Sequence, residues 1–393
     1  MTLLIDIGPL NERQSDVALE AFYKSSHNHD GDDSIWNPHD SPYIRRLIEL
    51  FTERGLTRLE KVREELNAWA TGERHRTGEP VPRPEGFMRR WDKGEIELVK
   101  LYLQTLPPEE FILDDWGMVV DYLVQRYLPE DELRTEAEWL ATRSGLMGKV
   151  QANMKNPPTF NQADRLLSVM PNTVMDASRQ FKLSPMQHAV LDFGRVRAAG
   201  AVTRLSDNVR HKMRDVIMQH EEHKMLSGSA AAGPSLKTRL IDEFAILNKD
   251  WRRIAVTEAG ECQVQGYVAS CKPGTKLRRV ERYQNVCAFC RKIDGVVVEV
   301  VEPDRPNKDP ETMIWTGKNN IGRSASPRKR VGGALVERPP GEMWQIPAGL
   351  CHPHCRGSYV PELKFEPEDD GDFAKWLNNN LGRNDTTTES SSN

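Results

Sequence analysis

Residues 287–290 read Cys-Ala-Phe-Cys, and residues 351–355 read Cys-His-Pro-His-Cys. These two stretches hold four of the six cysteines of the 393-residue chain, and the 60 residues 291–350 separate them. A two-residue spacer lets both sulfurs of the first stretch face one ion, and a Cys/His pair from the second would complete the four ligands that structural Zn²⁺ prefers. The sequence therefore predicts a zinc site that ties two distant segments together.

The second stretch offers more ligands than one ion needs, namely Cys351, His352, His354 and Cys355. The predicted zinc ligands are Cys287, Cys290, His352 and Cys355, with Cys351 as the substitute. A filled site of this kind has no open position for water, so it favours a structural role over catalysis. Free thiols without metal are the alternative. Disulfides are a lesser one, because six cysteines are too few for a disulfide scaffold in so long a chain.

The composition indicates a globular protein without a membrane span. Hydrophobic residues make up 38% of the sequence and the formal net charge is only −4, so any nucleic-acid partner would have to meet local basic patches. No apolar run reaches the roughly 20 residues that span a bilayer, and the N-terminus lacks the pattern of a secretory signal. We expect a soluble protein, made in the cytoplasm, with no membrane partner.

The N-terminal half has the apolar spacing of an α-helical assembly. From Ser41 to Val62, apolar residues recur at helical intervals, interrupted by Gly55. Proline pairs at 107–108 and 157–158 separate the later helices, because proline lacks the amide donor and clashes with the preceding turn. Those later helices are expected at Ile96–Leu106, Phe111–Leu128 and Glu130–Met154.

A single long helix is expected next. Ser184 and Pro185 have the pattern of an N-cap and a first-turn proline, and the helical pattern continues to about Met225. At about 1.5 Å per residue this helix would be roughly 60 Å long, a length typical of helices that lie against other chains. Small residues and a proline then form the clearest linker, at 227–235, so we place the main domain boundary there.

The pattern changes after the linker. Helical spacing returns at Leu236 and continues toward Thr257, and Val296–Val301 is a β-branched run that follows a turn. Met343–Ile346 is the candidate for a second strand. This half of the chain is therefore predicted to be α+β.

The predicted fold class is α+β: a mostly α-helical N-terminal half with a long helix, followed by a small zinc-stabilised α+β domain. The tail is acidic and then rich in Ser, Thr and Asn, so it has little to bury. The predicted divisions are a mobile arm at 1–40, a helical domain at 41–180, the long helix at 181–226, the linker at 227–235, the zinc domain at 236–365 and a disordered tail at 366–393.

Three motifs follow one another in the C-terminal half: Trp251–Glu258 (Trp-Arg-Arg-Ile-Ala-Val-Thr-Glu), Cys287–Cys290 with Asp294-Gly295 after it, and His352–Arg356 (His-Pro-His-Cys-Arg). Together they resemble the phage head morphogenesis domain of Mu F-like minor head proteins. In that family a helix ending in Thr-Glu leads to a Cys-x-x-Cys with a following Asp-Gly, and the domain closes on His-Pro-x-Cys-Arg-Cys. Gly357 stands here in place of the last cysteine, and Cys351 is the candidate replacement. The resemblance covers roughly residues 236–363.

The resemblance implies a minor capsid protein of a tailed phage, present in few copies near the portal and acting in head assembly, DNA packaging or ejection. Its partners would be the portal protein and the major capsid protein, and its location the virion. No reaction is implied, so an enzyme is not expected.

The alternatives are enzymes. A Cys-x-x-Cys with a later Cys/His pair also occurs in zinc-supported HNH-like nucleases, where a histidine activates water. No histidine lies between the two cysteine stretches, so the base would have to be His352 or His354, which the zinc also needs. A toxin-type ADP-ribosyltransferase would use Arg253 and Glu258, but no NAD-binding pattern accompanies them.

Basic residues gather in two places, where they suit contacts with phage DNA or with an acidic portal surface, and a solvated face is the alternative. The first group flanks the first cysteine pair: Lys272, Lys276, Arg278, Arg279, Arg282, Arg291 and Lys292. The second lies in a Gly/Ser/Pro-rich loop: Arg323, Arg328, Lys329 and Arg330.

Overall fold

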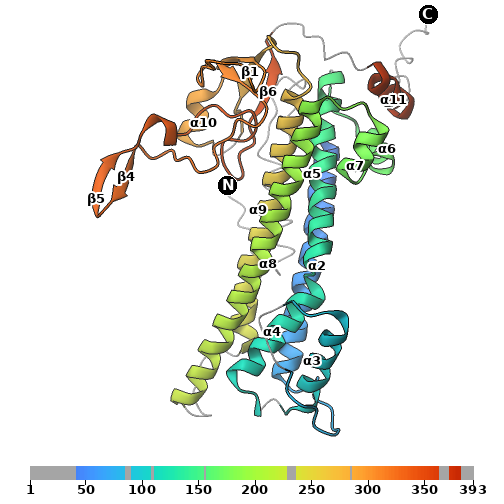
Figure 1. Ribbon diagram of the computed structural model, residues 1–393, viewed down its shortest axis with the longest axis vertical. Helices are drawn as coiled ribbons and strands as arrows, with labels where there is room; N and C mark the ends of the chain where they lie inside the picture. The colour runs from blue at the N-terminus through green and yellow to red at the C-terminus, as the bar shows by residue number, and fades with distance from the viewer. Residues whose placement is uncertain are drawn as a thin grey trace, which may run out of the picture. The chain divides into compact units, whose positions relative to one another are not determined.

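A computed structural model describes residues 41–84, 90–107, 110–154, 156–227, 236–283, 286–362 and 371–381. They belong to one compact unit, Trp36–Asn393, which combines α-helices with a small sheet in its C-terminal part (Figure 1). The predicted arm at 1–40 and residues 228–235 of the predicted linker lie outside the described residues. In the described segments, no helix has both the length and the apolar character needed to cross a membrane.

Most of the described chain is helical, and α5, α8 and α9 pack against one another, with α2 against α5 and α9 (Figure 1). Helix α4 packs on α2 and α8, and α3 packs on α4. We call α2, α5, α8 and α9 the helical bundle. The helices up to the sheet are α2 (Pro42–Ala70), α3 (Lys93–Thr105), α4 (Leu113–Tyr127), α5 (Glu130–Asn153), α6 (Phe160–Val169), α7 (Val174–Gln180), α8 (Pro185–Ser227) and α9 (Leu236–Val268).

Helix α2 begins after Ser41 and runs through Gly55 without the predicted interruption. A Cβ atom on Gly55 would lie 1.9 Å from Cε2 of Trp251, so the indole of α9 packs directly on the backbone of α2. The indole Nε1 of Trp251 also donates a hydrogen bond to the carbonyl of Phe51, at 3.2 Å. Gly55 is therefore required by a close approach between helices and does not mark a break.

Helix α8 confirms the prediction of one long helix. Its first turn is capped by Ser184, whose Oγ accepts a hydrogen bond from the amide of Gln187 at 3.2 Å. Helix α9 continues to Val268, ten residues beyond Glu258, so the helix does not end at the Thr-Glu step. The extra turns pack on α5, where a Cβ on Gly148 would lie 2.2 Å from the carbonyl oxygen of Gln263.

The sheet has four short strands in the order β3-β2-β1-β6, with β1 antiparallel to β2 and β6, and β2 parallel to β3. We call residues 276–361 the sheet module. Its remaining elements are a separate two-stranded ribbon, β4–β5, and two short helices. The elements are β1 (Lys276–Val280), α10 (Ala288–Ile293), β2 (Val297–Val300), β3 (Met313–Ile314), β4 (Arg328–Val331), β5 (Ala334–Glu337), η2 (Pro340–Glu342) and β6 (Ser358–Pro361).

Of the two strands predicted in the C-terminal half, one is confirmed and the other is corrected. The strand expected at Val296–Val301 is confirmed as β2, but Met343–Ile346 makes only a single bridge, between Ser324 and Met343. The second strand that pairs with β1 is instead β6.

The predicted disordered tail is wrong for Gly371–Leu381, which forms α11 and packs on α6. Phe373, Leu377 and Leu381 follow one another at intervals of four and are buried, so an apolar stripe is present within an otherwise polar segment. The ring of Phe373 lies 5.1 Å from that of Phe181. Residues 363–370 and 382–393 lie outside the described part of the chain.

Candidate metal centre

The first cysteine pair opens helix α10. Cys287 is the N-cap residue, and its Sγ accepts a hydrogen bond from the amide of Cys290 at 3.4 Å. Cys290 is fully buried, and Gly295, with φ of +79°, turns the chain from α10 into β2. Because an N-cap side chain folds back over the first turn of its helix, both thiols lie on the same side of the segment.

The second stretch turns sharply just before β6. His354 has φ of +62°, a left-handed conformation that is uncommon for a residue other than glycine. Cys351 and Cys355 are buried, whereas His354 is exposed and its amide donates a hydrogen bond to Oγ1 of Thr257, at 3.3 Å. The turn therefore separates the two histidines, and only His352 reaches the cysteines of α10.

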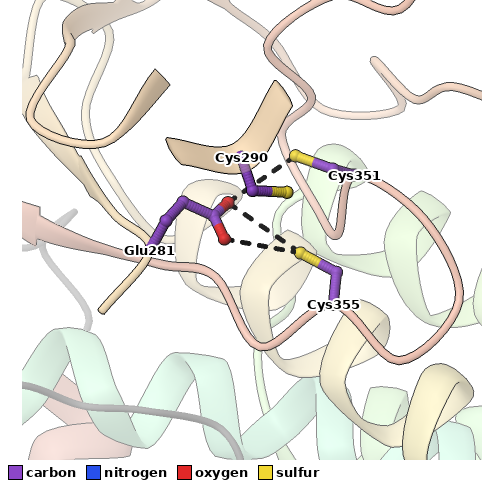
Figure 2. Close-up of side chains that lie close together, drawn as sticks. All are labelled: Glu281, Cys290, Cys351 and Cys355. Atoms are coloured by element: carbon purple, nitrogen blue, oxygen red, sulfur yellow. Dashed lines mark hydrogen bonds between the residues drawn. The ribbon is translucent and has the colours of Figure 1, made fainter. Parts of the chain in front are cut away.

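Two groups of potential metal ligands result, and within each group all ligand atoms lie within 4.8 Å of one another. Figure 2 shows the carboxylate of Glu281 and the thiols of Cys290, Cys351 and Cys355 pointing toward one another. Cys290 belongs to both groups. The histidine group consists of Cys287, Cys290 and His352, and the glutamate group of Glu281, Cys290, Cys351 and Cys355.

The four predicted ligands are thus divided between the two groups. Cys287, Cys290 and His352 form the histidine group, and Cys355 lies with Cys290 in the glutamate group. The Nε2 atom of His352 lies 3.4 Å from Sγ of Cys287 and 3.3 Å from Sγ of Cys290. Tetrahedral zinc with ordinary bond lengths places sulfur and nitrogen ligands about 3.5 Å apart, so the histidine group fits a metal of this kind. Binding by this set stays a prediction.

The imidazole of His352 is oriented from its other side. Its Nδ1 lies 2.8 Å from the carbonyl oxygen of Pro353, and its ring stacks on the indole of Trp344 at 5.4 Å. A proton on Nδ1 donated to that carbonyl leaves the lone pair of Nε2 facing the sulfurs, the arrangement in which histidine binds metal. Burial lowers the pKa of His352, but the Pro353 carbonyl and the neighbouring cysteines raise it by more, so the pKa is raised.

A buried ion pair lies beside the thiols. The side chains of Arg279 and Glu281 are both fully buried, and Nε of Arg279 donates to Oε1 of Glu281 at 2.8 Å. The guanidinium also lies 3.6 Å from Sγ of Cys351 and 3.8 Å from Sγ of Cys355. Arg279 was counted from the sequence among basic surface residues. It is instead buried, where its positive charge stabilises the carboxylate of Glu281 and favours the ionised form of Cys355.

This ion pair explains why position 357 is glycine. A Cβ on Gly357 would lie 2.1 Å from Oε1 of Glu281 and 2.3 Å from Nη2 of Arg279. The place where the resembling family carries its last cysteine is therefore filled here by the ion pair. A thiol is instead available at Cys351, which is 2% exposed and whose Sγ lies 3.6 Å from Oε1 of Glu281.

The thiols differ in how readily they ionise. Burial raises the pKa of Cys287, but hydrogen bonds from Cys290 and the proximity of His352 outweigh it, so the pKa is lowered. Hydrogen bonds from the thiols of Cys290 and Cys351, together with Arg279, also lower the pKa of Cys355. Burial raises the pKa of Cys351. Metal ions bind thiolates and not thiols, so Cys287 and Cys355 are the sulfurs best prepared to bind one.

A glutamate of helix α9 connects the second cysteine stretch to the helical bundle. Glu261 accepts a hydrogen bond from the amide of Leu350, the residue before Cys351, and also pairs with Arg197 of α8 at 3.1 Å. Glu258 accepts from Nε of Arg197 at 2.7 Å. The first motif of the resemblance, Trp251–Glu258, is therefore used for contacts between elements.

Three functional residues were not singled out as such from the sequence: Glu281, Arg279 and Glu261. One signal for the first two was present, because Leu277 and Arg279 alternate on the buried face of β1, and Glu281, just after the strand, continues that alternation. For Glu261 no comparable signal exists, since its role depends on where residues 349–350 cross the helix.

Comparisons with protein-family models, with curated proteins and with solved structures find no match to this chain. The fold and site define an α+β protein with a thiol-rich candidate metal centre next to a helical bundle. The resemblance to the head morphogenesis family rests on the three motifs and their order.

Proposed function

We propose that this chain is a structural minor capsid protein of a tailed phage, acting near the portal, and that one zinc ion holds its sheet module together. The observation that carries the proposal is the convergence of residues 287–290 and 351–355, which are distant in the sequence, in two groups of potential ligands that share the buried Cys290. A closed metal site of this kind stabilises a fold and leaves no position for substrate.

The proposed ligands are Cys287, Cys290, His352 and Cys355. The choice of Cys355 over Cys351 is supported by its lowered pKa and by the hydrogen bond that its Sγ accepts from the amide of Gly357, at 3.4 Å. Amide donors stabilise thiolate charge. Cys351, with its raised pKa, would then remain a thiol beside Glu281.

A structural role is favoured over the nuclease alternative by the state of the histidines. Both ring nitrogens of His352 are engaged, one by the two sulfurs and one by the Pro353 carbonyl. His354 belongs to neither group of ligands, and its backbone amide donates to Oγ1 of Thr257. A histidine-dependent nuclease requires a histidine that is free to accept a proton from water, and the nitrogens of His352 are already engaged.

A role between larger partners is supported by α8. This helix has 43 residues, and Phe193, Val196 and Met218 on it are 47%, 56% and 55% exposed. Exposed apolar side chains along a long helix suit contacts with another protein, here the portal or the major capsid protein.

Elemental analysis of the purified full chain tests the metal. About one equivalent of zinc is expected, and less than about half an equivalent in folded protein would contradict the proposal. Cys355→Ser should lose zinc while Cys351→Ser keeps it. Cys271→Ser is the matched control, because Cys271 is buried but its Sγ lies against the Tyr267 carbonyl, outside both groups.

Mass spectrometry of purified phage particles tests the biological role. The chain should be present in few copies and co-purify with the portal protein, and its absence from both filled and empty heads would contradict the proposal. Incubation of the full chain with plasmid and Mg²⁺ or Mn²⁺ tests the alternative. Nicking that disappears in His354→Ala would favour a nuclease.

A further inference from the structure

The β4–β5 ribbon is a regular hairpin in a segment that the sequence indicates only as a basic loop. Its two strands pair antiparallel from Arg328 opposite Glu337 to Val331 opposite Ala334. Gly332 and Gly333 have φ of +58° and +88°, the positive values that a two-residue hairpin turn of the type matching strand twist requires. The ribbon is therefore a defined element with fixed side-chain positions.

The ribbon is almost entirely exposed. All of its strand residues except Lys329 are exposed, and Leu335 and Val331 are 62% and 54% exposed. It forms no pairing with the four-stranded sheet (Figure 1). A hairpin that buries so little is marginal in water, so its exposed surface suits a partner that covers it.

The exposed cations of the ribbon strands, Arg328 and Arg330, lie on one of its faces. Residues directly opposite one another share a face, so Arg328 and Arg330 lie on one face, and Lys329 lies on the other with Val336. Within the described residues, the guanidinium groups of Arg328 and Arg330 have no ion-pair or hydrogen-bond partner. Residues 323–338 contain five basic residues and one acidic residue, a local excess in a chain whose net charge is negative.

The residues next to the ribbon, which we call its root, are fixed by ion pairs and hydrogen bonds with one another and with the ribbon. Glu342 accepts from Nζ of Lys329 at 2.5 Å and from Nη1 of Arg338 at 3.1 Å. Nη1 of Arg323 donates to the Gly341 carbonyl at 2.6 Å. These cations are used to fix the root, so Arg328 and Arg330 are the ones available to a partner.

The root also touches the candidate metal centre. The indole of Trp344 donates to the carbonyl of Arg323 at 3.2 Å, stacks on His352, and meets the ring of Phe289 edge-on at 5.4 Å. The metal centre thus sets where the ribbon leaves the sheet module.

We infer that the ribbon binds duplex DNA by lying in the major groove, with Arg328 and Arg330 on phosphates along one of its walls. The major groove admits a two-stranded β-ribbon. The guanidinium groups of Arg328 and Arg330 recur on one exposed face, and their planar donor geometry matches phosphate oxygens. Contacts of this kind are independent of base sequence. The inference goes beyond the proposed capsid role and does not require it.

The test measures binding of the full chain to a mixed-sequence duplex of about 30 base pairs by fluorescence anisotropy at several salt concentrations. The double variant Arg328→Glu/Arg330→Glu should bind at least about tenfold more weakly, and its salt slope should fall by about 0.9 for each phosphate that the ribbon no longer neutralises. The matched control is Lys61→Glu/Lys93→Glu, which makes the same change in net charge at exposed positions of α2 and α3. It should bind about as well as the parent.

Three outcomes would overturn the inference: no binding by the parent at low salt, affinity that does not respond to salt, or equal weakening in the variant and the control. Capture of purified portal protein by the parent and not by the ribbon variant, without DNA binding, would assign the ribbon to a protein partner instead. Zinc content and circular dichroism of each variant are measured alongside. These measurements distinguish a loss of DNA binding by the ribbon from a loss of the metal centre or of the fold.

Discussion

The helical bundle and the sheet module are stabilised in different ways. In the bundle, long helices bury a continuous apolar core that includes Tyr43, Leu140 and Trp251. The four-stranded sheet has strands of two to five residues, and beside its smaller apolar core lie a buried ion pair and a cluster of thiols. Short strands bury too little apolar surface to stabilise a fold alone. The candidate metal ligands and the buried ion pair thus lie in the region with the smaller apolar core.

Removal of zinc should have the largest effect: the sheet module should unfold while the helical bundle stays folded. A strong chelator added to the full chain is expected to abolish protease resistance of residues 276–361 and change the fluorescence of Trp344, which stacks on His352. Structural zinc contributes on the order of 10 kcal/mol to folding of small domains. Far-ultraviolet circular dichroism should keep its helical signal, and added zinc should restore the module. Loss of the helical signal together with the module would contradict this division.

Gly148→Ala should destabilise the helical bundle and leave the metal centre intact. The new Cβ would lie 2.2 Å from the Gln263 carbonyl oxygen, so α5 and α9 would have to move apart. We expect the free energy of unfolding in urea to fall by about 3 kcal/mol, with zinc retained in the protein that remains folded.

Gly200→Ala is its control, because the nearest atom to the new Cβ is the flexible end of Arg204, at 3.5 Å. It should change the unfolding free energy by less than about 1 kcal/mol, in the stabilising direction. Equal effects of the two substitutions would show that the α5–α9 contact is looser than described.

Glu281→Gln should weaken the metal centre without touching the bundle. The substitution leaves the buried Arg279 without a carboxylate partner. In the parent, Nε of Arg279 lies 2.8 Å from Oε1 of Glu281. Removal of a residue that supports metal ligands lowers metal affinity by about 10- to 100-fold, measured by competition with a chromophoric chelator. Glu299→Gln is the control, since its pair with Arg305 is exposed on β2; a comparable decrease there would contradict the role of Glu281.

The pH dependence of zinc binding should be the smallest of these effects. A hydrogen bond with Cys351 lowers the pKa of Cys290, but Cys355 and burial raise it by more, so this thiol is protonated in the metal-free protein at neutral pH. Zinc binds the thiolate, so binding releases this proton and apparent affinity rises with pH, about tenfold per unit for each proton released. Titrations between about pH 6 and pH 8 measure it, and affinity that stays flat or falls would contradict the assignment.

Regular helices were the most predictable part of the structure. Ser184 and Pro185 marked the start of α8, and the β-branched run at Val296–Val301 marked β2. Each prediction rests on information within a few neighbouring residues. Gly55 was misread because its contact, Trp251, lies far away in the sequence, and α11 was missed because its apolar stripe is short.

The cysteine and histidine spacing alone was enough to bring residues 287–290 and 351–355 into one hypothesis, because ligand chemistry is a property of residue types. Only the tertiary structure divided those ligands into two groups sharing Cys290, and only it brought Arg279, Glu281 and Glu261 to them. The physical reason is that burial and ion pairing depend on which distant segments meet. No local pattern contains that information.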